Sequence, residues 1–280
     1  ATAGTSNVRF GVNAGNSIVS GGAGNVFVGD QAGTAITTGD YNVALGYRAL
    51  DTEDTGNKNV AVGANTFRSL NVSGDGFNTA VGHQSGYAVT TGTNNTLIGG
   101  LAGDAITTAE YNVAVGSSAL GANTTASYNT AIGGSALSKN TTGALNTSIG
   151  YATLFDNTTG ANNTAIGYLA LENNTTASNN VAVGKSALGA NTTGTRNVAV
   201  GTNALDANIV GDKNIAIGVD ALGGNVDGSR SVAVGDSALS NQDPASAVEM
   251  YNTAVGHGAG ASVTTAIENT LIGGLAGDAI

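Results

Sequence analysis

The sequence predicts an all-β fold, a parallel β-solenoid of sixteen coils with a 17-residue repeat. Three observations lead to this prediction. A glycine-centred motif recurs along the chain at a nearly constant spacing, the repeat is too short for a pair of helices, and the composition suits a thin core. The chain has 44 Gly, one Pro, no Cys and no Trp, and 10% of its residues are charged. It is therefore too apolar for a disordered chain and too poor in large side chains for a thick globular core.

The repeated motif is Asn-(Val/Thr)-Ala-(Val/Ile)-Gly. One copy begins at Asn180 and ends at Arg196, and the residues of every copy are numbered below as positions 1 to 17 in the same way. Twelve of the fifteen spacings between the motif glycines are 17 residues, and the others are 18, 19 and 21. The glycines, all at position 5, are Gly11, Gly29, Gly46, Gly63, Gly82, Gly99, Gly116, Gly133, Gly150, Gly167, Gly184, Gly201, Gly218, Gly235, Gly256 and Gly273.

A 17-residue unit accommodates one coil of parallel β-structure. Helical repeats exceed 30 residues, whereas short Val, Ile and Thr stretches between Gly-Asn-Thr turns are typical of strands. Stacked coils are separated by about 4.8 Å, so sixteen coils predict a single rod about 75 Å long that comprises residues 1–280.

Two positions of the repeat are nearly invariant and predict structural ladders. The glycine at position 5 never changes, which favours a corner with positive φ or a close backbone approach that a Cβ atom would block. Position 1 is Asn in fifteen copies and Ser231 in the sixteenth, which predicts a hydrogen-bonded ladder of side-chain amides. Representative ladder residues are Asn42, Asn59, Asn112, Asn163, Asn180, Gly46, Gly116, Gly167 and Gly184.

Strand alternation assigns the neighbouring positions to opposite faces. Position 4 is always apolar, from Phe10 to Ile272, and is predicted to point into the core. Position 3 is Ala in eleven copies and is predicted to point outward, where a stripe of small residues would suit packing against another copy.

Positions 9 and 12 covary and predict a shared core pocket. Nine coils have Leu at position 9 and a polar residue, usually Asn, at position 12, whereas six coils have Gly at position 9 and an aliphatic residue at position 12. A close-packed interior accommodates one large side chain there per coil. Leu188 and Ile36 are therefore expected in the same axial column. The exception, Phe67 with Leu70, lies in a coil lengthened by two residues.

A longer period overlies the 17-residue repeat. Residues 78–106 and 252–280 align without gaps, and the offset of 174 residues corresponds to ten coils plus four inserted residues. The insertion, residues 241–251, contains Pro244 and Met250 and is predicted to form a surface loop.

Charge and composition argue against several functions. The net charge of −10, with only nine Lys and Arg, argues against a nucleic-acid partner, and no apolar run approaches the length of a membrane-inserting helix. His83 and His257, both at position 6, are interpreted as exposed surface residues, and the acidic segment Asp51–Asp54 lacks the spacing of a calcium loop. No catalytic, cofactor-binding or metal-binding residue is predicted, so we expect a protein that is not an enzyme.

Two sets of surface residues have alternative interpretations. Asn-Thr-Thr recurs at 123, 140, 157, 174 and 191 and matches the glycosylation sequon. The preferred interpretation is a turn at a fixed point of each coil. Position 17 is rich in aromatic and basic residues. The candidates for weak glycan recognition are Tyr41, Tyr111, Tyr128 and Tyr251. The preferred interpretation is that these tyrosines are solvated residues at the edge of the coils.

The repeat resembles sequences of two fibrous families. The segment Asn163 to Thr176, followed by Ala177, resembles the repeats of bacteriophage tail fibres, and the shorter core Asn-x-Ala-(Val/Ile)-Gly is similar to the β-roll heads of trimeric autotransporter adhesins, whose coils are shorter. The resemblance covers the whole chain. It implies a fibrous, usually trimeric protein that acts in attachment at an extracellular, cell-surface or virion location.

The expected function is the structural shaft of such a fibre, with copies of the chain as partners. An ice- or glycan-binding solenoid is the alternative. The ice-binding reading would use the Thr residues at positions 13 and 14, but adjacent strand residues face opposite ways and do not form a flat array. Surface glycans are a further candidate partner. The chain stops at Ile280, position 12 of a coil, and Ala1 to Ser6 resemble the missing part of that coil, so we expect either a longer repetitive protein or head-to-tail stacking of copies.

Overall fold

The chain folds into stacked coils of parallel β-structure. The computed structural model describes residues 6–19 and 21–278, and in these ranges every regular element is a strand. The contacts define two compact units, residues 1–142 (unit 1) and 143–280 (unit 2). The strands of unit 1 are β1 (Val8–Phe10), β2 (Val26–Val28), β3 (Val43–Leu45), β4 (Val60–Val62), β5 (Thr79–Val81), β6 (Thr96–Ile98), β7 (Val113–Val115) and β8 (Thr130–Ile132). Those of unit 2 are β9 (Thr147–Ile149), β10 (Thr164–Ile166), β11 (Val181–Val183), β12 (Val198–Val200), β13 (Ile215–Ile217), β14 (Val232–Val234), β15 (Thr253–Val255) and β16 (Thr270–Ile272).

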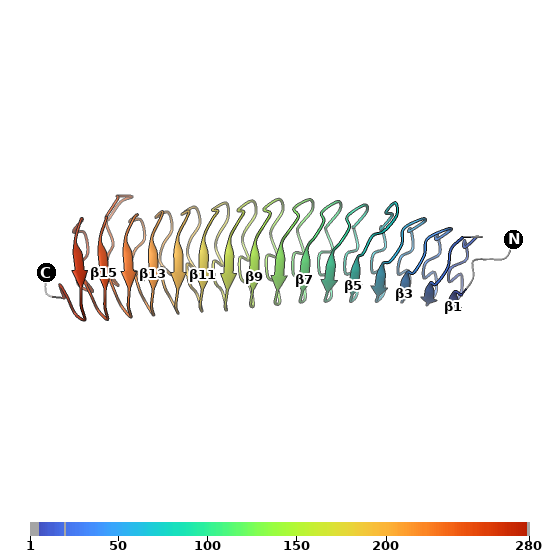
Figure 1. Ribbon diagram of the computed structural model, residues 1–280, viewed down its shortest axis with the longest axis horizontal. Coiled ribbons are helices and arrows are strands. Elements are labelled where there is room, and N and C mark those ends of the chain that lie inside the picture. The colour runs from blue at the N-terminus through green and yellow to red at the C-terminus, as the bar shows by residue number, and fades with distance from the viewer. Residues whose placement is uncertain (1–5, 20, 279–280) are drawn as a thin grey trace. The chain divides into compact units, whose positions relative to one another are not determined.

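Within each unit, every strand pairs in parallel with the strand of the next repeat (Figure 1). The register matches equivalent positions, so that Ala44 lies beside Ala61 and Ala182 beside Ala199. One turn of the chain therefore adds one strand to the sheet, which defines a β-solenoid. The predicted all-β fold with a 17-residue coil is confirmed. No helix that could cross a bilayer occurs in the described ranges.

The position-5 glycine satisfies both requirements inferred from its invariance. Gly46 has φ of 136°, and Gly184 has φ of 138°, in a region that other residues rarely adopt. A Cβ atom on Gly46 would lie 2.6 Å from the carbonyl of Gly63 in the next coil. Only glycine allows the corners of successive coils to stack this closely.

The predicted directions of positions 3 and 4 are wrong. In every strand from β2 to β15 the middle residue, position 3, is buried, and the two residues beside it are half-buried or exposed. In β13, for example, Ala216 is fully buried, whereas Ile215 and Ile217 are 37% and 41% exposed. Strand alternation holds, but its phase is opposite to the one that hydrophobicity suggested. The coil interior is thin enough to be filled by Ala.

Large residues at position 3 explain why glycine at position 9 occurs in consecutive coils. The ring of Phe27 lies 2.6 Å from the Cβ positions of both Gly15, in the preceding coil, and Gly33, in its own coil. Leu97 lies in the same way between Gly86 and Gly103, within 2.9 Å of either Cβ position. A large side chain at position 3 therefore fills the space that two position-9 leucines occupy elsewhere.

The shared pocket of positions 9 and 12 is present. Leu188 and Ile36 are both fully buried. A Cβ atom on Gly103 would lie 2.8 Å from Cδ1 of Ile106, so an aliphatic residue at position 12 reaches the volume next to position 9. Position 12 thus compensates for the missing leucine, as the covariation predicts.

Besides the glycine at position 5, positions 7, 9 and 17 adopt left-handed backbone conformations, and in the coils with Leu at position 9 all three are residues other than glycine. In the eleventh coil these are Ser186 at position 7, Leu188 at position 9 and Arg196 at position 17, with φ of 55°, 52° and 58°. Each such residue costs about 1–2 kcal/mol. The amide of Ser186 donates to Tyr168 O of the preceding coil at 2.9 Å, and that of Leu188 donates to Ala204 O of the next coil at 3.0 Å. The strained conformations therefore direct amides alternately to both neighbouring coils.

The insertion at residues 241–251 is only partly a surface loop. Residues 245–249 are exposed, but Pro244 and Met250 are buried. Both side chains lie over Gly228, at 3.2 and 3.1 Å from its Cβ position. The predicted coil end at Ile280 and the segment from Ala1 lie outside the described residues.

Candidate functional site

The column of position-1 asparagines forms a buried ladder in each unit. In unit 1, the amide of Asn42 donates to Asn25 Oδ1 at 2.8 Å, and Asn42 Nδ2 donates to Gly56 O of its own coil at 2.7 Å. In unit 2, Asn180 repeats these contacts with Asn163 Oδ1 and Gly194 O, at 3.0 and 2.9 Å. The backbone amides of Asn59 and Asn112 likewise donate to Oδ1 of the preceding asparagine in the column. The ladder joins each coil to the one before it and closes the coil upon itself.

A second ladder, at position 12, was not recognised in the sequence. Asn191 Nδ2 donates to Asn174 Oδ1 at 3.1 Å and to Gly194 O at 3.0 Å, and both asparagines are fully buried. The sequon asparagines Asn123, Asn140 and Asn157 are buried as well. A glycan cannot be attached to a side chain that lies inside the coil. The available signal was the run of Asn at position 12 in seven consecutive coils, from Asn123 to Asn225.

Glu53 occupies position 12 of the third coil, where other coils have Asn, Gln or an aliphatic residue. Its carboxylate is fully buried and accepts hydrogen bonds from the amides of Gly56, at 2.8 Å, and Val72, at 3.2 Å. Burial raises the pKa of this carboxyl, although the two amides oppose the rise. Val72 belongs to the coil that is two residues longer, so Glu53 satisfies an amide in an irregular part of the stack.

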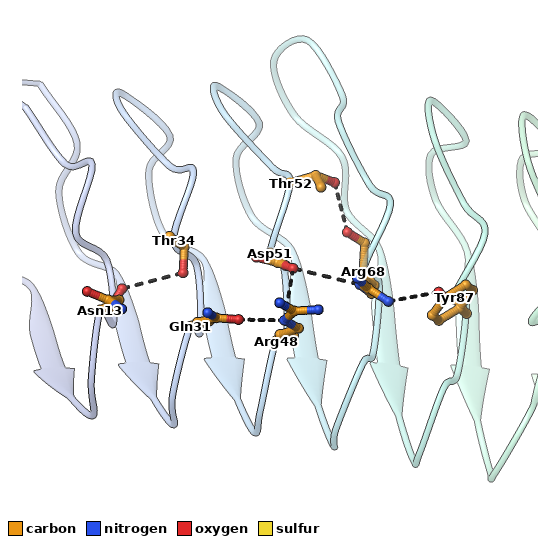
Figure 2. A network of polar contacts seen from close by, with 8 residues as sticks. All are labelled: Asn13, Gln31, Thr34, Arg48, Asp51, Thr52, Arg68 and Tyr87. Atoms are coloured by element: carbon orange, nitrogen blue, oxygen red, sulfur yellow. Dashed lines mark hydrogen bonds and ion pairs between the residues drawn. The ribbon is translucent and has the colours of Figure 1, made fainter.

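Polar side chains at positions 7, 10 and 11 form a network of contacts along the first five coils (Figure 2). Asp51 Oδ2 lies 3.7 Å from Nε of both Arg48 and Arg68. Arg48 Nε also donates to Gln31 Oε1 at 2.5 Å, and Arg68 Nη1 donates to Tyr87 OH at 2.9 Å. All of these contacts except Arg48–Asp51 join neighbouring coils, and the pairs are partly exposed, so each adds little to stability.

The carboxylates of the acidic segment have partners within the chain. The Asp51 carboxylate faces two guanidinium groups, Glu53 is directed inward, and Asp54 accepts a hydrogen bond from the Thr37 hydroxyl. Within residues 6–19 and 21–278 no three His, Cys, Asp or Glu side chains gather around one point. His257 is exposed and lies 3.6 Å from an oxygen of Asp236.

The position-17 tyrosines are exposed and contact their neighbours along the column. Tyr111 and Tyr128 stack face to face, with ring centroids 5.2 Å apart and planes at 3°. Each ring therefore offers only one free face to a sugar. Tyr251 lies against Arg230, and both residues donate hydrogen bonds to Glu249. These hydrogen bonds lower the pKa of Glu249, and the one from Tyr251 raises the pKa of Tyr251 itself. The column combines aromatic and charged residues in contacts between coils.

A distinctive surface of each unit is the outer face of its β-sheet. The term outer face refers below to the surface formed by positions 2 and 4 of every coil. None of these positions is charged in any of the sixteen coils, although the chain has 28 charged residues, nine basic and nineteen acidic. Position 4 is always aliphatic or Phe, and exposed examples include Leu45, Ile98, Ile166 and Ile217. Continuous exposed apolar surface of this kind marks interaction sites.

The fold and this surface define a repeat-built β-solenoid with an uncharged, exposed sheet face. Comparison with protein-family models, curated proteins and solved structures gives no match.

Proposed function

We propose that the chain is a non-catalytic structural segment of a fibre, the shaft that supports attachment at an extracellular, cell-surface or virion location. We further propose that the shaft assembles when the outer face of one copy packs against the outer face of another. The observation that carries this proposal is the outer face itself. The resemblance of the repeat to tail fibres and adhesin heads supports the fibrous role.

A second copy suits the outer face better than a charged or irregular partner. Both columns of this face are uncharged along the whole chain, so two such faces meet without burying an unpaired charge. Consecutive strands are in register, which makes the face regular, and β-branched side chains fill it. Two regular sheet faces pack at about 10 Å with interdigitated side chains.

The exposed polar groups serve structural contacts. Asp51, Arg48 and Arg68 join coils, and Lys58 Nζ contacts Asp75 Oδ2 at 2.6 Å, which lowers the pKa of Asp75. Such pairs between adjacent coils favour a role in cohesion rather than in chemistry.

Introduction of charge on the outer face tests the assembly. The variant Ile166→Lys/Ile217→Lys places two cations on the outer face of unit 2, and we expect it to sediment as a monomer under conditions in which the unmodified chain associates. Thr176→Lys/Thr193→Lys is the matched control, because these exposed residues at position 14 lie outside the outer face. Circular dichroism verifies that both variants retain β-structure. A monomeric unmodified chain, or equal association of all three proteins, would refute the proposal.

The location is tested on intact material. An antibody against the exposed residues 245–249 should label filaments on unpermeabilised cells or virions. Labelling confined to permeabilised cells would contradict an extracellular or virion fibre.

Ice binding is the second candidate, with the outer face as the candidate surface in place of the Thr residues at positions 13 and 14. The hydroxyls at position 13 donate to carbonyls of the next coil, as Thr107 does to Thr124 O at 3.1 Å. The outer face, in contrast, presents Thr at position 2 and an aliphatic residue at position 4 in seven coils, including those of β6 and β10. A thermal-hysteresis assay separates the candidates, because activity that is lost in Ile166→Lys/Ile217→Lys would favour ice over a second copy.

A further inference from the structure

We infer that neighbouring copies pack in parallel and in register, with the position-17 edge of one outer face against the position-6 edge of the next. This inference rests on the proposed function, because it specifies the orientation of the copies that meet at the outer face. It is carried by the two columns that border that face.

Each strand is bordered by one residue from either column. Position 17 lies two residues before the strand residue at position 2, and position 6 lies two residues after position 4. At β3 these are Tyr41 and Tyr47, which are 62% and 46% exposed. The two columns therefore form the rims of the outer face, and they are rich in Tyr and in charged residues. An apolar centre with an aromatic and polar rim is the composition of a protein interface.

The two rims are compatible in charge at equal strand level. Large residues on one rim occur with small residues on the other at some levels, as Tyr111 with Ser117 at β7 and Tyr128 with Gly134 at β8, whereas β3, β5, β9 and β15 have large residues on both rims. At β14, Arg230 and Asp236 have opposite charges. From β2 to β16, no strand level sets two like charges on the opposing rims.

Symmetry makes this compatibility specific for parallel copies. If two copies are related by an axis along the stacking direction, the position-17 rim of one meets the position-6 rim of the other at the same level. An axis along the strands would instead set position 17 against position 17, in reversed order. If the axis along the strands passes through the centre of unit 2, Arg196 of each copy lies against Lys213 of the other, so that two pairs of like charges form. Like-charge juxtaposition of this kind disfavours the antiparallel alternative.

Contacts within one chain leave the rims accessible. Arg230 contacts Glu249 at 2.6 Å, and Asp236 contacts His257 at 3.6 Å, yet the side chains of Arg230 and Asp236 remain 37% and 54% exposed. Because these groups already have partners, the rim pair Tyr41 and Tyr47 provides a clearer test.

Cross-linking of introduced cysteines measures the orientation directly. The chain has no cysteine, so Tyr41→Cys and Tyr47→Cys each introduce a single thiol. Chains carrying one or the other variant, distinguishable by mass, are mixed, unfolded, refolded together and treated with a bismaleimide whose spacer spans about 10 Å, the distance between packed sheets. We expect a heterodimer linked through residues 41 and 47. Ser117→Cys is the control partner for Tyr41→Cys, since it is exposed on the same rim four coils away, about 19 Å along the stack, and should give no such product.

The outcomes separate the inference from the proposed function. Association in sedimentation without the 41–47 product, or equal products with residues 47 and 117, overturns the parallel register and leaves the proposed shaft intact. A chain that stays monomeric overturns the proposed function, and the orientation with it. Leu145→Cys with Tyr151→Cys, which border β9, repeats the test in unit 2 if either unit 1 variant fails to fold.

Discussion

Replacing Ala182 by Leu tests the packing rule of the coil interior. Ala182 is the buried position-3 residue of β11, and the corresponding Leu97 occupies space beside glycines at position 9 of its own and the preceding coil. Around Ala182 these two positions are Leu171 and Leu188, both fully buried. The added side chain therefore has no room, and we expect Ala182→Leu to destabilise the protein by about 1–3 kcal/mol.

Replacement of both leucines by glycine should reverse part of this effect. Each Leu→Gly change removes a core side chain at a cost of about 2–5 kcal/mol, and it relieves a left-handed non-glycine conformation that costs about 1–2 kcal/mol. In the triple variant Ala182→Leu/Leu171→Gly/Leu188→Gly, the new leucine has room and restores about 2 kcal/mol of burial. The overpacking of about 1–3 kcal/mol disappears as well. The triple variant should thus lose about 3–5 kcal/mol less than the sum of its parts.

Urea unfolding followed by circular dichroism gives these energies, and native-state hydrogen exchange localises them to coils 10 to 12. Exchange is needed because a repeat protein can unfold in parts. Thr193→Leu, which adds the same side chain at an exposed site, is the control and should change stability little. If the effects add to within about 0.5 kcal/mol, the three positions do not share one volume and the packing rule is wrong.

Three further predictions concern the ladders and the corner. Asn180→Ala should cost about 1–3 kcal/mol, because it leaves the buried Gly194 carbonyl and Asn197 amide without this partner, whereas Thr193→Ala at an exposed site of the same coil should be nearly neutral; equal unfolding midpoints of the two variants would contradict the ladder. The pKa of Glu53 is raised in the folded protein. The stability linked to its protonated form is therefore present below the pKa of the unfolded chain and is lost as the pH rises through the pKa of the folded protein. The urea midpoint of Glu53→Gln, measured across this pH range, should not show that decline. Gly184→Ala should prevent the eleventh and twelfth coils from stacking normally, because its Cβ atom would lie 2.4 Å from Gly201 O, and unchanged amide protection of these coils would refute the close approach.

The repeat length, the invariant corner and the position-1 ladder could be predicted because each depends on identity at a fixed spacing. The residues equivalent to Gly46 and Asn42 have the same physical role in every coil, so the recurrence of Gly and Asn at these positions reveals that role. The direction of the strand faces could not be read from hydrophobicity, since Ile217 is more apolar than Ala216 and yet lies outside. The informative signal was size: Phe27 at position 3 occurs only where position 9 is Gly.

The buried amides at position 12 were missed for a similar reason. Asn191 is polar, and its motif is typical of a turn. Its hydrogen bonds to Asn174 and Gly194 nevertheless allow its side chain to be buried in the interior of the coil. The left-handed conformation of Leu188 has no signal in the sequence, because leucine is among the residues least expected there.

The closure of each coil upon itself has a mechanical consequence. A coil advances the stack by about 4.8 Å, but its 17 residues span about 56–61 Å when fully extended. Pulling one coil free therefore releases about 50 Å of hidden length, while the position-1 ladder holds the next coil in place. Under tension, such a chain would yield in discrete steps and dissipate energy at each one, so that a sudden load is absorbed by a few sacrificial coils rather than transmitted to whatever the chain is joined to.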